Sequence, residues 1–344
     1  MRATSLSPLL CRMQVNNMSK NEEYLRRRIA AGSKYEDLLK FPKYFEIETV
    51  NACNARCPMC TIGDWQRDSP GMSDDLFKKI ADEISEHKEH VERVSLYRDG
   101  EPLLDKRLPN RIAYLKAAGV KRVGIATNVS LLDERRATDI LKAGIDEVIM
   151  SVDSLQKNVF EEMRLGLKFE TVLENALSFV ELRNRLRPQT SIWMRMVVGK
   201  NNANEWASYR DYWSSRLNDQ DRLYYHSMHN WGGQLSGGVP TLSYEPTLPC
   251  IALWSLMVIF ANGDIPLCNV DYNNKFPTGD VRQASIADVW QSAILTQRRQ
   301  QHLGGEKAAT SLCANCNVWD EQGDHNAEFL SAQYGSAQFI QGTE

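Results

Sequence analysis

The chain has 344 residues, of which 42% are hydrophobic and 25% charged, close to the average for soluble globular proteins. Its 41 lysines and arginines nearly balance 44 aspartates and glutamates, and the net charge of −3 gives no general attraction for nucleic acid or anionic lipid. No apolar run approaches the roughly 20 residues of a membrane-spanning helix, and the apolar stretch near the N-terminus is too short for a signal peptide. The sequence therefore predicts a soluble, cytoplasmic protein without nucleic-acid or membrane partners.

Strand-like and amphipathic segments alternate along most of the chain. Six buried strands are predicted, at residues 44–50, 91–97, 121–126, 146–152, 191–198 and 222–228. The helices predicted between them lie near residues 74–87, 107–118, 133–143, 168–186 and 205–217, the first with Ser73 as its N-cap. Strand-then-helix units of this kind predict an α/β fold with a parallel sheet and right-handed crossovers. In barrel-like sheets of this class, the chemistry collects at the carboxyl ends of the strands.

Changes in composition divide the chain into five parts. Residues 1–43 are predicted to be an extension with a leading helix, partly disordered, and residues 44–231 to form the α/β unit. The Gly- and Pro-rich residues 232–249 are typical of a linker. Residues 250–320 contain the last four cysteines, and residues 321–344 are predicted to form a tail or helix.

The eight cysteines carry most of the functional information. A chain of this length without an export signal does not need disulfides, so clustered cysteines indicate metal binding. The first group is C-x3-C-x2-C, directly after the first predicted strand, and consists of Cys53, Cys57 and Cys60. A closed structural zinc site needs four ligands, and no histidine lies near this group in the sequence. Three thiolates instead leave one metal position open for a ligand.

The second group has a full set of four cysteines. Cys250 and Cys268 flank a glycine-marked turn, and Cys313 and Cys316 form a C-x2-C pair. Four thiolates suit a saturated iron–sulfur cluster, although C-x2-C is also a zinc signature. Cys11 is left over, in the segment that we expect to be disordered.

The first cysteine group and the residues at the following strand ends resemble the radical S-adenosylmethionine (SAM) superfamily. Gly100-Glu101-Pro102 resembles the GGEP element of that family, with Asp99 in place of the first glycine. Thr127-Asn128 follows the third strand, where the family often has Thr-Asn-Gly, with Val129 in place of the glycine. Ser151 and Asp153 end the fourth strand, and Arg195 lies on the fifth. The second cysteine group resembles the twitch domain, a shortened SPASM domain, and this resemblance implies a small α+β domain over residues 250–320.

The resemblance implies a partial (β/α)6 TIM-like barrel that reductively cleaves SAM to a 5′-deoxyadenosyl radical, which abstracts hydrogen from the substrate. It implies that the first three cysteines hold a [4Fe–4S] cluster whose fourth iron binds SAM, and that the other four hold one auxiliary [4Fe–4S] cluster. It further implies that Met59 packs near the adenine of SAM, and that the backbone of Gly100-Glu101-Pro102 or the Glu101 carboxylate binds the SAM ammonium. Four more residues are implied to contact the adenosyl group, the ribose hydroxyls or the methionine carboxylate of SAM. These four are Asn128, Ser151, Asp153 and Arg195.

A saturated auxiliary cluster suits electron transfer, and electron transfer suits a net oxidation. We therefore expect an oxidoreductase of dehydrogenase type that acts on a sugar, an aminocyclitol or a nucleotide sugar, with flavodoxin or ferredoxin as electron donor. A peptide maturase that acts on a precursor peptide (making a crosslink or an epimerised residue) and a zinc-bound, non-catalytic scaffold are the alternatives. His226, His229, Trp231 and Tyr224 are candidates for substrate contact or for packing. No general base is evident from the sequence.

Overall fold

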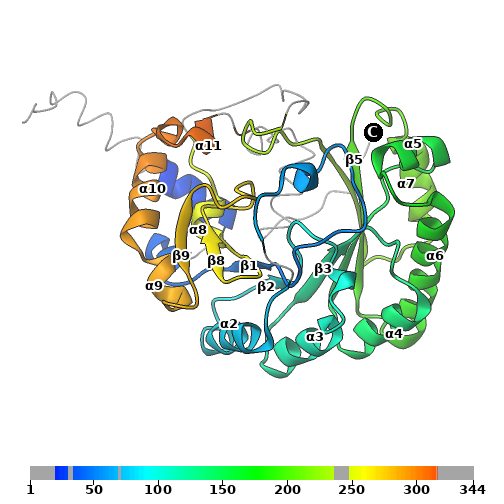
Figure 1. Ribbon diagram of the computed structural model, residues 1–344, viewed down its shortest axis with the longest axis horizontal. Helices are drawn as coiled ribbons and strands as arrows, with labels where there is room; N and C mark the ends of the chain where they lie inside the picture. The colour runs from blue at the N-terminus through cyan, green and yellow to red at the C-terminus, as the bar shows by residue number, and fades with distance from the viewer. Residues whose placement is uncertain (1–19, 30–33, 69–70, 236–247, 315, 317–344) are drawn as a thin grey trace, which may run out of the picture.

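A curved sheet of seven parallel strands forms the centre of the protein (Figure 1). The computed structural model describes residues 20–29, 34–68, 71–235, 248–314 and 316. The strand order is β6-β5-β4-β3-β2-β1-β7, and every neighbouring pair is parallel. The strands are β1 (Tyr44–Ile47), β2 (Arg93–Ser95), β3 (Val123–Thr127), β4 (Glu147–Ser151), β5 (Ser191–Val198), β6 (Arg222–Ser227) and β7 (Leu256–Ile259). All six predicted strands are confirmed, and β7 adds a seventh at the edge.

The helices between the strands pack along the outer side of the curve (Figure 1). They are α2 (Asp74–Glu86), α3 (Leu108–Ala117), α4 (Glu134–Lys142), α5 (Lys157–Met163), α6 (Phe169–Leu186) and α7 (Trp206–Ser214). Ser73 caps α2 as predicted, because its side chain accepts a hydrogen bond from the amide of Leu76. Helix α5 is the one member of this series that the sequence analysis did not predict.

The C-terminal segment is joined to the sheet through β7, which pairs with β1 from Tyr44↔Leu256 to Ile47↔Ile259. Around β7 lie α8 (Ala252–Ser255), the antiparallel pair β8 (Asp264–Pro266) and β9 (Pro277–Asp280), α9 (Ile286–Trp290), α10 (Ala293–Leu303), the 3-10 helix η4 (Lys307–Ala309) and α11 (Ser311–Ala314). This confirms a partial barrel followed by a small α+β unit. The strand pair with β1 holds the second cysteine group at a fixed place beside the barrel.

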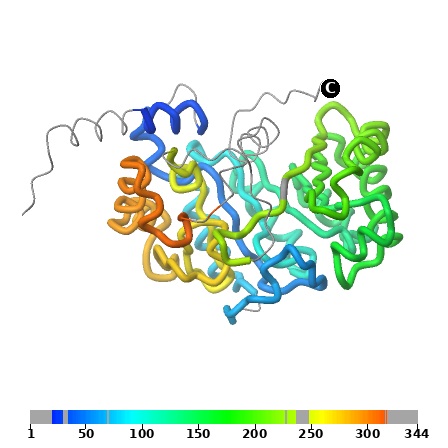
Figure 2. The backbone as a smooth tube through the Cα atoms, turned by 90° about the horizontal axis from the view of Figure 1, so that it is seen from above, coloured from blue at the N-terminus to red at the C-terminus, as the bar shows by residue number. Residues whose placement is uncertain are grey.

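The chain before the barrel also packs on this C-terminal segment. Helical residues 20–29 lie beside the segment that contains α10 (Figure 2), and the Asn21 side-chain amide donates a hydrogen bond to the Leu303 carbonyl at 2.9 Å. The predictions for Cys11, for most of the linker and for residues 321–344 fall outside the described residues. Within the described part, no helix combines the length and the apolar character needed to cross a membrane.

The sheet has a buried core on both faces. Strands β1, β2, β3, β4 and β7 are buried along their whole length, as expected for parallel strands with covered faces. The order of the sheet brings the carboxyl ends of β1 to β6 to one edge. Polar residues that follow different strands in the sequence therefore meet there.

Candidate active site

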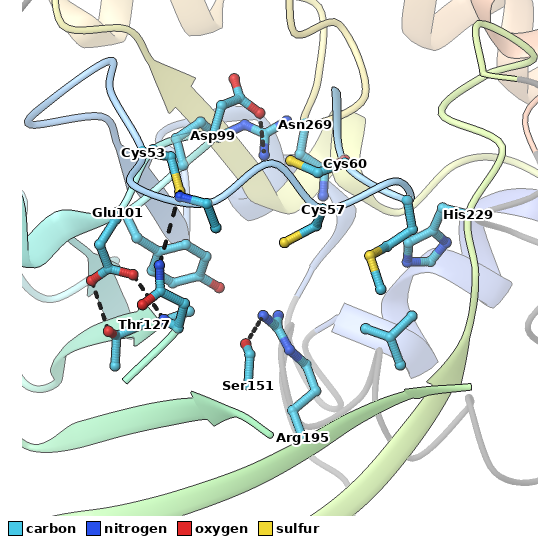
Figure 3. A pocket seen from close by; sticks show the side chains of 18 of the residues that line it. Cys53, Cys57, Cys60, Asp99, Glu101, Thr127, Ser151, Arg195, His229 and Asn269 are labelled. Carbon is cyan, nitrogen blue, oxygen red and sulfur yellow. Dashed lines mark hydrogen bonds and ion pairs between the residues drawn. The ribbon is translucent and has the colours of Figure 1, made fainter. Parts of the chain in front are cut away.

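A cavity of about 230 Å³ lies at the carboxyl ends of the strands (Figure 3). Its wall is formed by residues at the carboxyl ends of the strands and in the loops that follow them, and by the Asn269–Val270 loop of the C-terminal segment. All three cysteines of the first group line it, together with six of the eight predicted SAM-contact residues. These six are Met59, Gly100, Glu101, Asn128, Ser151 and Arg195. Most of the predicted site therefore lies around one enclosed space.

The loop that carries Cys53, Cys57 and Cys60 leaves β1 and ends at the 3-10 helix η2 (Thr61–Asp64). Its turn is closed by a hydrogen bond from the Cys60 amide to the Cys57 carbonyl at 3.0 Å. Burial raises the pKa of the Cys53 thiol and raises that of Cys60 to about 11. These two thiols are neutral near pH 7, so binding iron displaces their protons.

The absence of a side chain at Gly100 allows this cysteine loop to pack against the turn after β2. A Cβ atom there would lie 2.5 Å from the Val50 carbonyl oxygen and 2.6 Å from that of Ala52, both backbone atoms. The adjacent Glu101 amide donates a hydrogen bond to the Ala52 carbonyl at 2.8 Å. The family's glycine at this position is thus required by backbone approach, and it sets the position of the chain just before Cys53.

The carboxylate of Glu101 accepts three hydrogen bonds from the protein. It accepts hydrogen bonds from the Thr127 hydroxyl at 2.7 Å, the Asn128 amide at 2.7 Å and the Leu103 amide at 3.1 Å. Burial raises its pKa, and these donors oppose that shift. The carboxylate therefore ties the end of β3 to the turn, which leaves backbone carbonyls as acceptors for a ligand ammonium. Pro102 is buried but is not part of the cavity wall.

Val129 adopts a backbone conformation that favours glycine. Its φ is 68°, in the left-handed region that disfavours β-branched residues. The Thr127 hydroxyl accepts a hydrogen bond from the Val129 amide at 3.0 Å, and the Val129 side chain is fully buried. The local turn is therefore retained at the cost of strain. It directs Asn128 into the cavity, where the side chain donates to Asn54 at 2.9 Å.

Asp99, which stands where the family has a glycine, belongs to a buried network of charges. Its carboxylate contacts Arg67 at 3.1 Å and Arg98 at 3.3 Å. Arg67 also binds Glu48 through two hydrogen bonds of 2.8 and 2.7 Å, and Arg98 lies 3.6 Å from Glu46. Burial raises the pKa of Asp99 to about 6, and Arg98 opposes this. The network fixes the cavity wall on the side of β1 and β2.

Ser151 and Arg195 form the opposite wall. The Arg195 guanidinium donates a hydrogen bond to the Ser151 hydroxyl (Figure 3). Its Nε atom is buried without a hydrogen-bond partner, and among the described residues no carboxylate forms an ion pair with this side chain. A half-buried guanidinium that lines a cavity and forms no ion pair with a carboxylate is suited to an anionic ligand group.

Asp153 lies behind the cavity wall and contacts Arg164, which does line the cavity. Arg164 was not among the predicted site residues. Asp153 is fully buried and does not line the cavity. Its Oδ1 accepts from the Val197 amide at 2.8 Å, and its Oδ2 accepts from Arg164 Nε at 2.5 Å. Arg164 also lies 3.8 Å from the Cys57 sulfur. Asp153 therefore positions Arg164. Arg164 was not predicted as a site residue because it caps helix α5, which was not predicted either.

Two imidazoles and an indole close the cavity at the end of β6. The rings of His226 and His229 are stacked with centroids 4.9 Å apart, and both residues line the cavity. Burial, with a smaller effect of Arg195, lowers the pKa of His229 to about 4, so this imidazole is neutral near pH 7. The Trp231 indole donates to the Met59 carbonyl at 3.2 Å and so holds the cysteine loop from this side.

The four cysteines of the second group lie near one another in the C-terminal segment. Burial raises the pKa values of the Cys250 and Cys268 thiols, and it raises that of Cys313 to about 12. Neighbouring thiols of the same group raise these pKa values further. Among the described residues, no three His, Cys, Asp or Glu side chains are placed to share a single metal ion. The ligands of a four-iron cluster each bind a different iron, so such ligands stand further apart.

Comparisons with known proteins agree with this geometry. Residues 47–211 match the family model of the radical SAM superfamily, and residues 250–317 match that of SPASM, an iron–sulfur cluster-binding domain. The S-adenosyl-L-methionine-dependent 2-deoxy-scyllo-inosamine dehydrogenase of Niallia circulans is 24% identical over 83% of this chain and 96% of its own length.

Solved structures share the fold. The structure of BtrN in complex with AdoMet and 2-DOIA has a TM-score of 0.55 and 21% identity, over 81% of this chain and 94% of that one. Streptococcus suis SuiB bound to the precursor peptide SuiA has a TM-score of 0.62 and 14% identity, over 93% of this chain and 77% of that one. Together with the two family matches, the cavity and its cysteines identify the chain as a member of the radical SAM superfamily with a SPASM-type domain, an oxidoreductase whose cofactors are SAM and iron–sulfur clusters.

Proposed function

We propose that this enzyme oxidises a small polar substrate, such as a sugar, an aminocyclitol or a nucleotide sugar, by a radical mechanism. The observation that carries the proposal is that one cavity brings together three thiols from one loop, the strand-end polar residues and the loop that follows Cys268. A cavity at the strand ends limits the access of water, which would quench a radical. The dehydrogenase of Niallia circulans supports the same reaction class.

In this proposal Cys53, Cys57 and Cys60 hold the SAM-binding cluster. Three neighbouring thiols, two of them with pKa values raised by burial, and a cavity in front of them fit a cluster with one open iron. When bound, the cluster and SAM supply a one-electron reduction and a hydrogen-abstracting radical. Backbone carbonyls of the Gly100-Glu101-Pro102 turn accept from the ammonium, and Arg195 with Ser151 binds the carboxylate of SAM.

In this proposal the thiols of Cys250, Cys268, Cys313 and Cys316 would hold an auxiliary cluster, and this cluster would supply an acceptor for the second electron of the oxidation. The next two residues after Cys268, Asn269 and Val270, line the active cavity. One short loop therefore connects the auxiliary site to the substrate, which supports an electron relay. A low-potential donor such as flavodoxin or ferredoxin supplies the first electron.

The test is anaerobic reconstitution with iron and sulfide, followed by product analysis under reductant. We expect about eight iron atoms per chain, as two [4Fe–4S] clusters require, and formation of 5′-deoxyadenosine from SAM. Replacing Cys316 by alanine leaves reductive cleavage of SAM detectable but reduces substrate oxidation. Two bound zinc ions without SAM cleavage would instead establish the scaffold alternative, and turnover of a precursor peptide alone would establish the maturase alternative.

A further inference from the structure

The charges of the cavity wall indicate which class of small polar substrate the enzyme takes. This inference rests on the proposed function, because it concerns the space that SAM leaves for a substrate. A phosphorylated substrate brings one or two buried negative charges, and burying such charges requires cations that are not already neutralised. A phosphorylated substrate therefore needs a cationic side chain in the wall that is not already paired with a carboxylate.

Three guanidinium groups line the cavity, and two of them face carboxylates. Arg98 lies 3.3 Å from Asp99 and 3.6 Å from Glu46. Arg164 lies 2.5 Å from Asp153. These two cations are neutralised inside the protein and are not available to a phosphate.

The third guanidinium, that of Arg195, has no carboxylate partner among the described residues, but the proposed function assigns it to the carboxylate of SAM. The neighbouring network offers no replacement, because its carboxylates outnumber its guanidiniums. It contains Glu46, Glu48, Asp99 and Glu147 against Arg67, Arg93 and Arg98. Within the described part of the wall, the balance of charge therefore opposes a second anion. The same balance tolerates a cationic amine.

The wall beyond the cysteine loop offers hydrogen-bonding groups other than carboxylates and guanidiniums. His226 and His229 present stacked imidazoles, and the low pKa of His229, about 4, keeps its ring neutral. Asn269 contributes an amide side chain from the C-terminal segment (Figure 3), and Trp231 contributes an aromatic surface. An amide and a neutral imidazole each both donate and accept, which suits hydroxyl groups.

We infer that the substrate is an unphosphorylated, hydroxyl-rich ring compound, with or without an amine, and that Asn269 and the His226–His229 pair bind its hydroxyl groups. Of the three substrate types in the proposed function, this selects sugars and aminocyclitols over nucleotide sugars. Asn269 then serves two purposes, since it contacts the substrate and directly follows Cys268 in the sequence.

The test is equilibrium binding to the reconstituted holoenzyme loaded with SAM, without reductant, in the absence of oxygen. The probes are matched pairs: myo-inositol and its 1-phosphate, glucosamine and its 6-phosphate, and N-acetylglucosamine and its uridine diphosphate ester. We expect an unphosphorylated member to bind at least tenfold more tightly than its phosphorylated partner. Tighter binding of a phosphorylated member, or no binding by any unphosphorylated one, overturns the inference.

Two variants link the binding to the proposed wall. Replacing Asn269 by alanine removes one or two hydrogen bonds and is expected to weaken ring binding about tenfold, the equivalent of about 1.4 kcal/mol, without changing SAM binding. The matched control is Asn262→Ala, because the Asn262 amide bonds with Asp264 outside the cavity. Equal effects of both substitutions would refute the assignment of Asn269. Reductive SAM cleavage is measured separately, and its loss would contradict the proposed function without bearing on the binding preference.

Discussion

The close approach of the cysteine loop to Gly100 makes the substitution Gly100→Ala a sharp test of how the cluster site is built. The new methyl group would lie 2.5 and 2.6 Å from two backbone carbonyl oxygens, those of Val50 and Ala52, and 3.0 Å from the Ala52 nitrogen. Ordinary van der Waals contact begins near 3.4 Å, so the loop must move by most of an ångström. No flexible side chain can absorb this displacement, because all three neighbouring atoms belong to the backbone.

Forced overpacking of this kind costs about 1–3 kcal/mol, and the rigid neighbours place Gly100→Ala near 3 kcal/mol. For a chain of this size, that corresponds to a fall in melting temperature of on the order of 5 °C. The loop that moves leads directly to Cys53, so we also expect less iron bound after reconstitution and slower SAM cleavage. Calorimetry and iron analysis of oxygen-free protein measure these effects.

The matched control for this substitution is Gly63→Ala. Gly63 lies in η2, three residues after Cys60, and a Cβ atom there would meet nothing within 4 Å. We expect this variant to keep its melting temperature within about 1 °C and its full iron content, since surface substitutions usually stay within about 0.5 kcal/mol. If both alanine variants behave alike, the argument from close approach at Gly100 is wrong.

Three further substitutions test individual parts of the site. Arg164→Met leaves the fully buried Asp153 without its cation, so it should lower the free energy of unfolding in urea titrations by about 3–5 kcal/mol. The double variant with Asp153→Asn should recover part of this loss, because the uncompensated charge is removed. At residue 129, glycine relieves about 1–2 kcal/mol of left-handed strain that alanine retains. The free energy of unfolding of Val129→Gly should therefore exceed that of Val129→Ala, the reverse of the usual order for these two residues. The opposite ranking would show that the turn is unstrained. The pKa of His229 is near 4 in the folded state and near 6.5 in the unfolded chain, so the free energy of unfolding should fall as the pH is lowered from 6.5 towards 4. His229→Gln should reduce this dependence of stability on pH. An unchanged dependence would contradict the pKa shift.

The sequence predicted the framework because its signals are local. Alternating strands and amphipathic helices, the Ser73 cap and the spacing of the cysteines are each determined by residues close together in the chain. The topology then follows, since a parallel sheet gathers the strand ends at one edge. For that reason six of the eight predicted SAM-contact residues line the cavity, even though they come from different parts of the sequence.

Other features depend on contacts between distant residues and could not be predicted this way. The hydrogen bonds that the Glu101 carboxylate accepts from Thr127 and Asn128 join two strand ends, and its motif does not indicate them. Asp153 supports Arg164 from behind the wall, and no spacing rule connects the two. The pairing of β7 with β1 joins segments more than 200 residues apart, as does the bond between Asn273 and the Asp64 carbonyl.

The most direct measurement of the central claim is electron–nuclear double resonance on the reduced, oxygen-free enzyme with SAM labelled by ¹⁵N at the amino group. If the cluster held by Cys53, Cys57 and Cys60 has one iron without a protein ligand, the label shows hyperfine coupling to that cluster, and the coupling disappears in Cys57→Ala but persists in Cys316→Ala. Absence of coupling in the wild-type enzyme, or its persistence in Cys57→Ala, would contradict the account.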